Sequence, residues 1–213
     1  APEIVGTSLF GVFLNALSGT YAYVKQHRVY FKAAIPFAIA TLPGAILGSL
    51  VSDYFTGPTF SLSYGIFILI ISAIMYWNSS NKKAIATNFD ETLFIARKKL
   101  GIILSMFVGF ISSIFGIGGG IIHVPVMIYV LAFPPHMATA TSHFVLAVSS
   151  FMGVTSHIFL NHIVWIPALA VGFGAVIGAQ IGARLSKKTK PRSIILLLCI
   201  SLFLLGIRMI VES

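Results

Sequence analysis

The sequence predicts an all-α polytopic membrane protein built from two related halves. Mean hydropathy is +0.98, 57% of the residues are hydrophobic and only 9% are charged, whereas about a quarter charged is usual for a soluble domain. The apolar stretches are roughly 20 residues long, enough for a helix to cross about 30 Å of hydrocarbon, and they lack the alternation of a membrane barrel. Thr-Ser pairs occur in two of them, and the two pairs that we compare are Thr7-Ser8 and Thr141-Ser142.

The two Thr-Ser motifs lie 134 positions apart, and this shift aligns residues 1–51 with 135–185 without a gap. Small-residue matches also arise between unrelated membrane helices, but here they cluster. This pattern favours duplication of one membrane unit, as in transporters with internal symmetry. The matched residues are Phe10, Gly19, Ala34, Gly44-Ala45 and Gly48 with Phe144, Gly153, Ala168, Gly178-Ala179 and Gly182.

Polar or Pro/Gly-containing breaks separate the apolar stretches and give three units. Residues 1–78 form a first transmembrane repeat, 79–99 a cytoplasmic linker, and 100–213 a second repeat. Residues 100–134 have no counterpart in the first repeat, which we expect to be incomplete at its N-terminus. The predicted spans, of which the fifth is short, are 4–24, 31–52, 59–77, 100–115, 120–132, 137–160, 163–183 and 193–211.

The basic residues predict the orientation of these spans. They form three groups, which the positive-inside rule places in the cytoplasm. If 120–132 is a crossing, five crossings separate the two Thr-Ser motifs, and this odd number makes the repeats inverted. The inversion fails if 120–132 does not cross. The groups are Lys25/Arg28/Lys32, then Lys82/Lys83 with Arg97/Lys98/Lys99, then Arg184/Lys187/Lys188/Lys190/Arg192.

Four glycines in the five positions 116–120 interrupt an apolar stretch. They predict a broken or re-entrant helix, because glycine destabilises a continuous helix. Broken backbone inside a membrane must be satisfied by protein or a water-filled cavity, and free N–H groups there suit an anion. Gly118, Gly119 and Gly120 are therefore predicted to bind substrate. The alternative is a tight turn outside the membrane, or close helix packing.

Hydroxyl and imidazole groups near this break complete the predicted site. Thr141-Ser142 follows Pro134-Pro135 and is expected to open a helix beside the same cavity, with Thr7-Ser8 as its symmetry mate. His123 and His143 lie in apolar sequence, where an ionisable side chain indicates function. A structural role remains open for each hydroxyl, since Ser and Thr often bond to their own helix.

Several chemistries are disfavoured by what the sequence lacks. Cys199 is the only cysteine, no His pair has the i, i+4 spacing of a zinc protease, and no acidic residue occurs between Glu91 and Glu212. We therefore expect no metal and no cofactor. Nucleic acid is an unsuitable partner because the basic residues lie in short juxtamembrane groups. The expected partners are the lipid bilayer, a small anion, and H⁺ or Na⁺ as coupling ion.

Two segments resemble the sulfite exporter TauE/SafE family of membrane permeases. They are Gly116-Ile117-Gly118-Gly119-Gly120, with Val124-Pro125 following, and Pro135-His136-Met137-Ala138-Thr139-Ala140-Thr141-Ser142. The resemblance covers the whole chain. It implies transport of sulfite, sulfonates, thiosulfate or other small organic anions. His123 and His143 depart from the family pattern.

These observations together predict a secondary transporter of small anions that works by alternating access in the cell membrane. Competing interpretations are an anion channel, a non-transporting membrane subunit and an intramembrane enzyme. The enzyme is the weakest alternative, because Ser142 and His143 are adjacent and point about 100° apart on a helix. The sequence does not predict the direction of transport or the oligomeric state.

Overall fold

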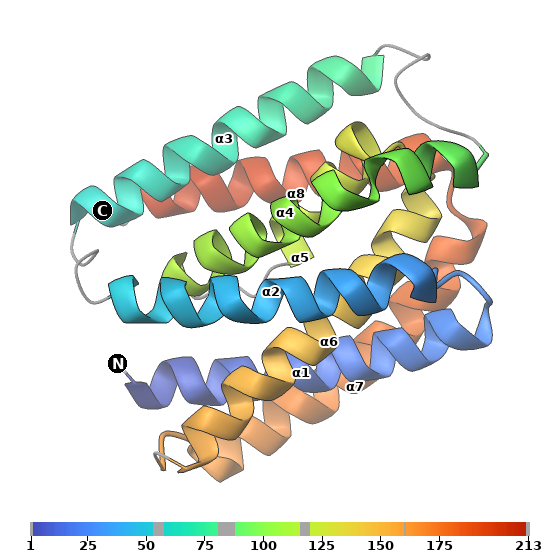
Figure 1. The fold of residues 1–213 in the computed structure, drawn as a ribbon. Helices are drawn as coiled ribbons and strands as arrows, with labels where there is room; N and C mark the ends of the chain where they lie inside the picture. The colour runs from blue at the N-terminus through green and yellow to red at the C-terminus, as the bar shows by residue number, and fades with distance from the viewer. Residues whose placement is uncertain (1, 53–57, 81–87, 116–119, 160, 212–213) are drawn as a thin grey trace.

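The computed structural model describes residues 2–52, 58–80, 88–115, 120–159 and 161–211, and all regular structure in these ranges is helical. The helices run along one common direction as a bundle (Figure 1). The all-α class is therefore confirmed. The elements are α1 (Pro2–Lys25), α2 (Phe31–Ser52), α3 (Pro58–Ser80), α4 (Glu91–Phe115), α5 (Gly120–Pro125), the π-helix η2 (Val126–Val130), α6 (Pro135–Phe159), α7 (Trp165–Lys188) and α8 (Pro191–Val211).

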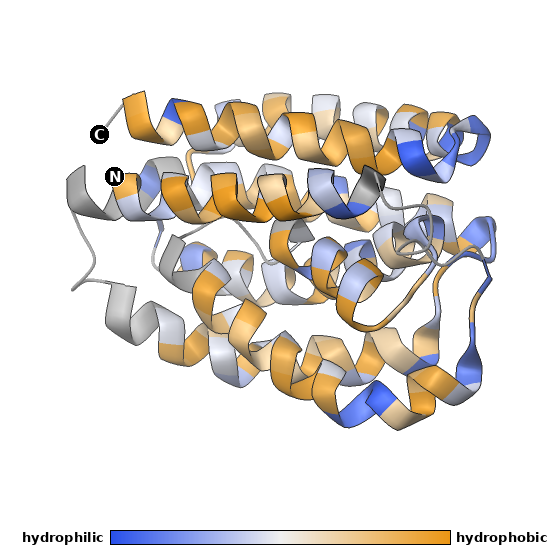
Figure 2. Cartoon of the chain, turned by 90° about the horizontal axis from the view of Figure 1, so that it is seen from above, coloured by the Kyte–Doolittle hydropathy of each residue, from blue (hydrophilic) through white to orange (hydrophobic). Residues whose placement is uncertain are grey.

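The outer surface of the bundle is that of a membrane protein. Four described helices are long and apolar enough to cross a bilayer, namely α2 over Phe31–Gly48, α6, α7 and α8, and α3 has a shorter apolar stretch. Large apolar side chains such as Ile166 and Phe173 of α7 are exposed. Hydrophobic residues extend along the helices, and most strongly hydrophilic ones gather at one end (Figure 2). A soluble protein rarely exposes so large an apolar surface.

The two turns that follow α1 and α6 have the same conformation at positions 134 apart. His27 and Asn161 both have φ of 55°, the left-handed region in which His and Asn are enriched. The N–H of His27 donates to the Val24 carbonyl at 2.9 Å, and that of Asn161 donates to Ile158 at 3.1 Å. Residues related by the 134-residue shift therefore also share a backbone conformation in these two turns.

Helices α1 and α6 pack against each other and run antiparallel (Figure 1). A Cβ added to Gly19 would lie 2.7 Å from Cδ2 of His143, and one added to Gly153 would lie 2.7 Å from Cδ2 of Leu9. The second contact is the first one shifted by 134 positions with the helices exchanged. In the same way, α1 packs on α7 and α6 packs on α2. Glycine at both crossings lets the backbones approach closely.

Helices α2 and α4 also approach through glycine. A Cβ on Gly44 would collide with the Met106 carbonyl group, and one on Gly109 would collide with the Thr41 carbonyl group. The repeat counterpart of Gly44 is Gly178 on α7, where a Cβ would have nothing within 4 Å. The α2–α4 interface therefore depends on glycine in a way that the exposed α7 surface does not.

The predicted short span 120–132 consists of two short helices. Helix α5 has 6 residues and η2 has 5, which together rise about 16 Å, half of the hydrocarbon thickness. They lie inside the bundle, and α6 begins beyond them at the hydrophilic end (Figure 1). Gly120 begins α5, whereas Gly118 and Gly119 lie outside the described residues.

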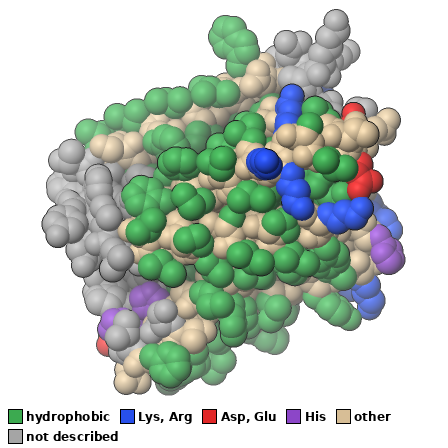
Figure 3. All heavy atoms as spheres, viewed as in Figure 1, with side chains coloured by type: hydrophobic (Ala, Val, Ile, Leu, Met, Phe, Trp, Pro, Cys, Tyr) green, Lys and Arg blue, Asp and Glu red, His purple; other side chains and the backbone are tan. Residues whose placement is uncertain are grey.

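The described members of the three basic groups lie at one end of the bundle, as the positive-inside rule predicts. Lys82 and Lys83 lie outside the described residues. Figure 3 shows Lys and Arg gathered there. Arg28 donates to the Ser186 hydroxyl of α7 at 3.3 Å, and Lys32 of α2 pairs with Glu91 of α4 at 2.7 Å. These contacts connect the first repeat to α7 and to α4.

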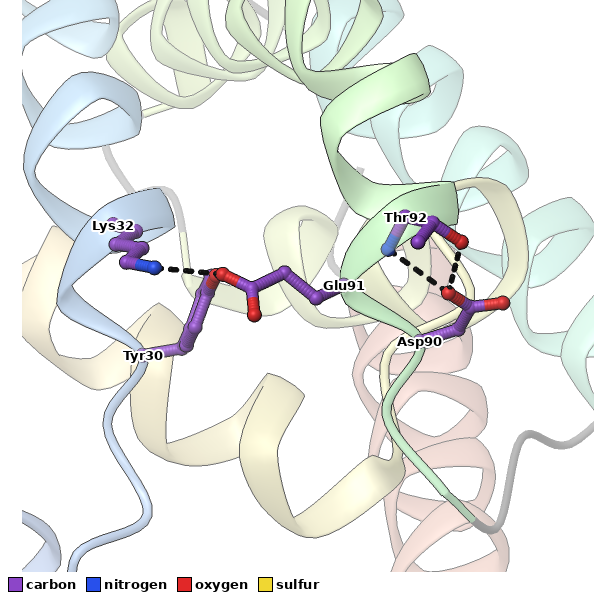
Figure 4. A network of polar contacts seen from close by, with 5 residues as sticks. All are labelled: Tyr30, Lys32, Asp90, Glu91 and Thr92. Atoms are coloured by element: carbon purple, nitrogen blue, oxygen red, sulfur yellow. Dashed lines mark hydrogen bonds and ion pairs between the residues drawn. The ribbon is translucent and has the colours of Figure 1, made fainter.

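Glu91 and its neighbour Asp90 fix the start of α4 (Figure 4). Glu91 Oε1 accepts from Lys32 and from the Tyr30 hydroxyl at 2.9 Å. Asp90 Oδ1 accepts from the Thr92 hydroxyl at 2.6 Å and from the Leu93 N–H at 3.1 Å, an N-terminal cap. The Thr92 hydroxyl and then the Leu93 N–H hold the pKa of Asp90 below its ordinary value.

We predict that Gly44→Ala lowers stability by about 1–3 kcal/mol, because the added methyl group pushes α4 away from α2. Gly178→Ala is the matched control, since it occupies the equivalent repeat position with open space. Thermal unfolding of both variants in detergent checks this. Equal unfolding midpoints would contradict the interpretation of the α2–α4 interface.

We predict that the first turn of α4 loosens in acid. The folded pKa values of Asp90 and Glu91 are both lowered, the latter by Lys32 and then Tyr30. Their contribution is thus present above the ordinary carboxyl pKa of about 4 and is lost as pH falls through the folded values. Hydrogen exchange of the Thr92 and Leu93 amides between pH 7 and pH 3, corrected for intrinsic rates, should show lost protection, and Asp90→Asn should flatten the change.

Candidate functional site

The second Thr-Ser motif and the glycine-led helix meet in the interior. Ser142 of α6 is buried, and its hydroxyl donates to the Gly120 carbonyl at 3.4 Å. Gly120 also packs against Leu146, which a Cβ would approach to 3.1 Å. The predicted proximity of the Thr-Ser motif to the glycine break is therefore present at Gly120.

His123 lies one turn after Gly120 on α5 and is 1% exposed. Its Nε2 is 2.9 Å from the Ser105 hydroxyl of α4, and its ring meets the ring of Phe37 edge-on with centroids 5.8 Å apart. The Ser105 hydroxyl is also 2.7 Å from the Gly101 carbonyl. The Nδ1 of His123 is buried without a hydrogen-bond partner in the structure.

Thr141 faces the turn between α1 and α2. Its hydroxyl is fully buried and accepts the Tyr30 N–H at 3.1 Å. The Tyr30 ring packs against the rings of Phe89, Phe94 and Phe133. Helix α6 begins at Pro135, so Thr141 and Ser142 lie in its second turn rather than opening it, and their amides belong to the helix. The motif therefore offers hydroxyls rather than free first-turn N–H groups.

Thr7 makes the equivalent bond at the opposite end. Its hydroxyl accepts the Val164 N–H at 3.1 Å, and Thr7 and Val164 are the residues 134 positions from Thr141 and Tyr30. The two motifs lie about 20 Å apart along the bundle, because Gly19 lies beside His143 in the antiparallel crossing. The structure does not bring Thr7-Ser8 together with Thr141-Ser142. Antiparallel packing places equivalent positions at opposite ends.

Ser8 is exposed at a surface depression of about 390 Å³ next to Thr7. Glu3, Val164, Pro167 and Val171 also line this depression. Its lining is mainly apolar, in contrast to the buried groups around Gly120. Thr7 and Ser8 therefore belong to a second, separate location.

His143 points away from the α5 cluster. Its Nδ1 is 3.3 Å from the Thr139 carbonyl of its own helix, and its ring meets that of Tyr23 of α1 with centroids 5.3 Å apart. It fills the space left by Gly19. His143 thus contacts the α1–α6 crossing rather than Ser142 or His123.

Sequence reasoning missed Ser105 and Tyr30. Ser105 is a hydroxyl within an apolar stretch, the same signal that identified the histidines, but its partner is 18 positions away and invisible in the sequence. Tyr30 contributes through its backbone N–H, which any residue but proline supplies. Among the described residues, no three His, Cys, Asp or Glu side chains are grouped to hold a metal ion.

We predict that Thr141→Val destabilises the protein by about 1–3 kcal/mol, the cost of leaving a buried donor such as the Tyr30 N–H unpaired. Thr7→Val is the matched control and should cost less, because that bond is exposed. Thr141→Ser should restore most of the loss. Thermal unfolding of the three variants checks the order, and a larger loss for Thr7→Val would contradict it.

Comparison with known proteins identifies the family of this chain. The sequence matches the family described as Sulfite exporter TauE/SafE over residues 1–209. It is 35% identical over 224 residues to "Probable membrane transporter protein YunE" of Bacillus subtilis (strain 168), covering 100% of this chain and 82% of that protein. A similarly named protein of Methanocaldococcus jannaschii is 28% identical, with 97% and 78% covered. No solved structure matches the chain significantly. The chain therefore belongs to the TauE/SafE family of membrane transporters.

Proposed function

We propose that this transporter carries small anions, sulfur-containing oxyanions or organosulfonates such as sulfite, thiosulfate and sulfonates. The substrate would bind where Ser142 and His123 meet the start of α5 at Gly120, and we propose that Gly118 and Gly119 contribute to the same site. The observation that carries the proposal is this buried group of uncharged polar side chains around α5, a helix too short to cross the membrane. Polar groups inside a membrane are costly and usually mark a substrate path.

The charge distribution favours an anion over a cation. No acidic residue occurs in the sequence between Glu91 and Glu212, a range that includes the whole of α5, α6 and α7. Glu91 itself is exposed and paired with Lys32 at the basic end. A cation in the interior would have no nearby carboxylate from these helices, whereas an anion meets hydroxyl and imidazole groups without charge repulsion.

The comparisons support the substrate class in one respect. The family description names sulfite export, whereas the relatives are named only as membrane transporters. From the sequence alone, we expect His123 and His143 to depart from the pattern of the family. We therefore propose the wider class of sulfur-containing anions rather than sulfite alone.

We further propose that two inverted halves, 1–78 and 100–213 joined by 79–99, alternate access by rocking. Three pairs of features related by the 134-residue shift support this: the turns at His27 and Asn161, the Gly19 and Gly153 contacts, and the Thr141–Tyr30 and Thr7–Val164 hydrogen bonds. Each half thus contacts the other in an equivalent way at opposite ends of the bundle. In transporters with inverted repeats, motion of one half against the other exposes the substrate site to one side of the membrane and then to the other.

The enzyme alternative is disfavoured by the arrangement of Ser142 and His143. The serine hydroxyl donates to the Gly120 carbonyl, and the histidine contacts Thr139 and Tyr23. A hydroxyl nucleophile requires its base within hydrogen-bond reach. These two side chains face different helices and do not form such a pair.

The function is tested by reconstituting the protein in liposomes and measuring uptake of radiolabelled sulfite, thiosulfate and methanesulfonate. We expect saturable uptake of at least one anion. Ser142→Ala should reduce transport about tenfold, which corresponds to one hydrogen bond of about 1.4 kcal/mol. Ser149→Ala is the matched control, because Ser149 lies two turns later on α6 and bonds only its own helix, at the Leu146 carbonyl.

The outcomes separate the alternatives. Flux that does not saturate would indicate a channel. No flux above empty liposomes for any of the three anions, with protein shown to be folded, would reject the proposed substrate class. Equal loss in the Ser142 and Ser149 variants would reject the site while leaving the transporter assignment intact.

A further inference from the structure

His123 is a buried imidazole whose hydrogen-bonding pattern can be deduced. The Ser105 hydroxyl has one hydrogen and lies 2.7 Å from the Gly101 carbonyl, which only accepts. That hydrogen therefore goes to Gly101. The same hydroxyl is 2.9 Å from Nε2 of His123, so Nε2 must supply the hydrogen of this second bond. The Nε2 position of His123 is thus protonated.

The other ring nitrogen is left without a partner. In a neutral imidazole protonated at Nε2, Nδ1 is a bare acceptor. Here Nδ1 is buried and makes no hydrogen bond, in a side chain that is 1% exposed. Buried polar atoms are rarely left unpaired, and an exception calls for a missing partner.

The helices around α5 do not supply this partner. On α4, Arg97 donates to the Val130 carbonyl; on α2, Lys32 pairs with Glu91. On η2, the Tyr129 hydroxyl donates to the Met75 carbonyl, and on α6 the His143 ring contacts Tyr23. The remaining charged or titratable side chains of these elements are not hydrogen-bonded to His123 Nδ1. They are Lys98 and Lys99 on α4 and His157 and His136 on α6, of which His136 contacts Arg28.

The free nitrogen belongs to the same short helix as the proposed anion site. His123 is three residues after Gly120, so both lie on one face of α5, and Ser142 donates to the Gly120 carbonyl. A bare lone pair repels an anion. A proton placed between the two removes the repulsion and supplies a charge-assisted hydrogen bond.

We propose that the site binds each anion together with one proton, which His123 Nδ1 shares with the substrate. This inference rests on the proposed function of the same site. The proton arrives either on the imidazole or on the anion as its conjugate acid. In both cases the occupied site holds one anion and one proton. Transport of a monovalent anion is then electroneutral and faster in acid. By linkage, anion affinity rises as pH falls, by up to about tenfold for each pH unit.

The test counts protons directly. Thiosulfate and methanesulfonate are the probes, because neither titrates near neutral pH and any proton taken up belongs to the protein; sulfite is run with its own protonation subtracted. Isothermal titration calorimetry in buffers of different ionisation enthalpy gives the protons bound per anion. Proteoliposomes containing a pH-sensitive dye report proton influx during anion uptake. We expect about one proton per anion in both measurements.

His123→Gln is the diagnostic variant, because its amide N–H can still donate to Ser105 while the side chain no longer titrates. We expect its anion binding to lose proton uptake and pH dependence. His143→Gln is the matched control in the same interior, and its anion affinity should keep the pH slope of the unmodified protein. Folding of both variants is checked by thermal unfolding, and the calorimetric proton count on the unmodified protein decides the question if His123→Gln fails to fold.

The outcomes distinguish this inference from the function on which it rests. Anion binding without proton uptake in the unmodified protein overturns the proton coupling and leaves anion transport standing. Proton uptake that persists in His123→Gln overturns the assignment to this residue. No binding of any of the three anions at any pH overturns the proposed function and the inference together.

Discussion

The antiparallel crossing of α1 and α6 determines where the other helices of this transporter lie. Gly19 and Gly153 permit the close approach, and each accepts a side chain of the partner helix at the equivalent position. The same crossing directs each helix toward the turn that follows its partner, so that Thr141 accepts the N–H of Tyr30 and Thr7 that of Val164. Helices α2 and α7 leave these turns on opposite sides. In lipid, where apolar surface alone gives little attraction between helices, such close packing and interhelical hydrogen bonds hold the bundle together.

The absence of water in the hydrocarbon explains how the interior is organised. Helix α5, with 6 residues, and η2, with 5, are each too short to span the hydrocarbon alone, and inside the bundle they must be enclosed by protein. Helix α4 encloses it on one side through Ser105, and α6 on the other through Ser142. The contact of α4 with α2 through Gly44 and Gly109 places Phe37 against the His123 ring. The polar groups are thus oriented by glycine-mediated packing of neighbouring helices rather than by α5 itself.

Part of the fold and of the site was predictable from local sequence. The apolar spans and the short fifth segment depend on composition and spacing, and the helices cover most of them, although α4 begins at Glu91, before the predicted span 100–115. The approach of Ser142 to Gly120 was also expected. The site depends on contacts between distant positions, such as Ser105 with His123, which no local pattern encodes. The same limit applies to His143, which the sequence places beside Ser142 but which contacts α1 because adjacent helical residues point about 100° apart.

The sequence by itself determined that this is a helical membrane protein, because hydropathy and span length are properties of the chain alone. It also determined that the middle of the second half is rich in glycine and free of acidic residues. Only the tertiary structure decided that the two Thr-Ser motifs lie at opposite ends, since that depends on the antiparallel direction of α1 and α6. It alone decided that one ring nitrogen of His123 is paired and the other free, because hydrogen bonding of a buried group depends on which helices surround it.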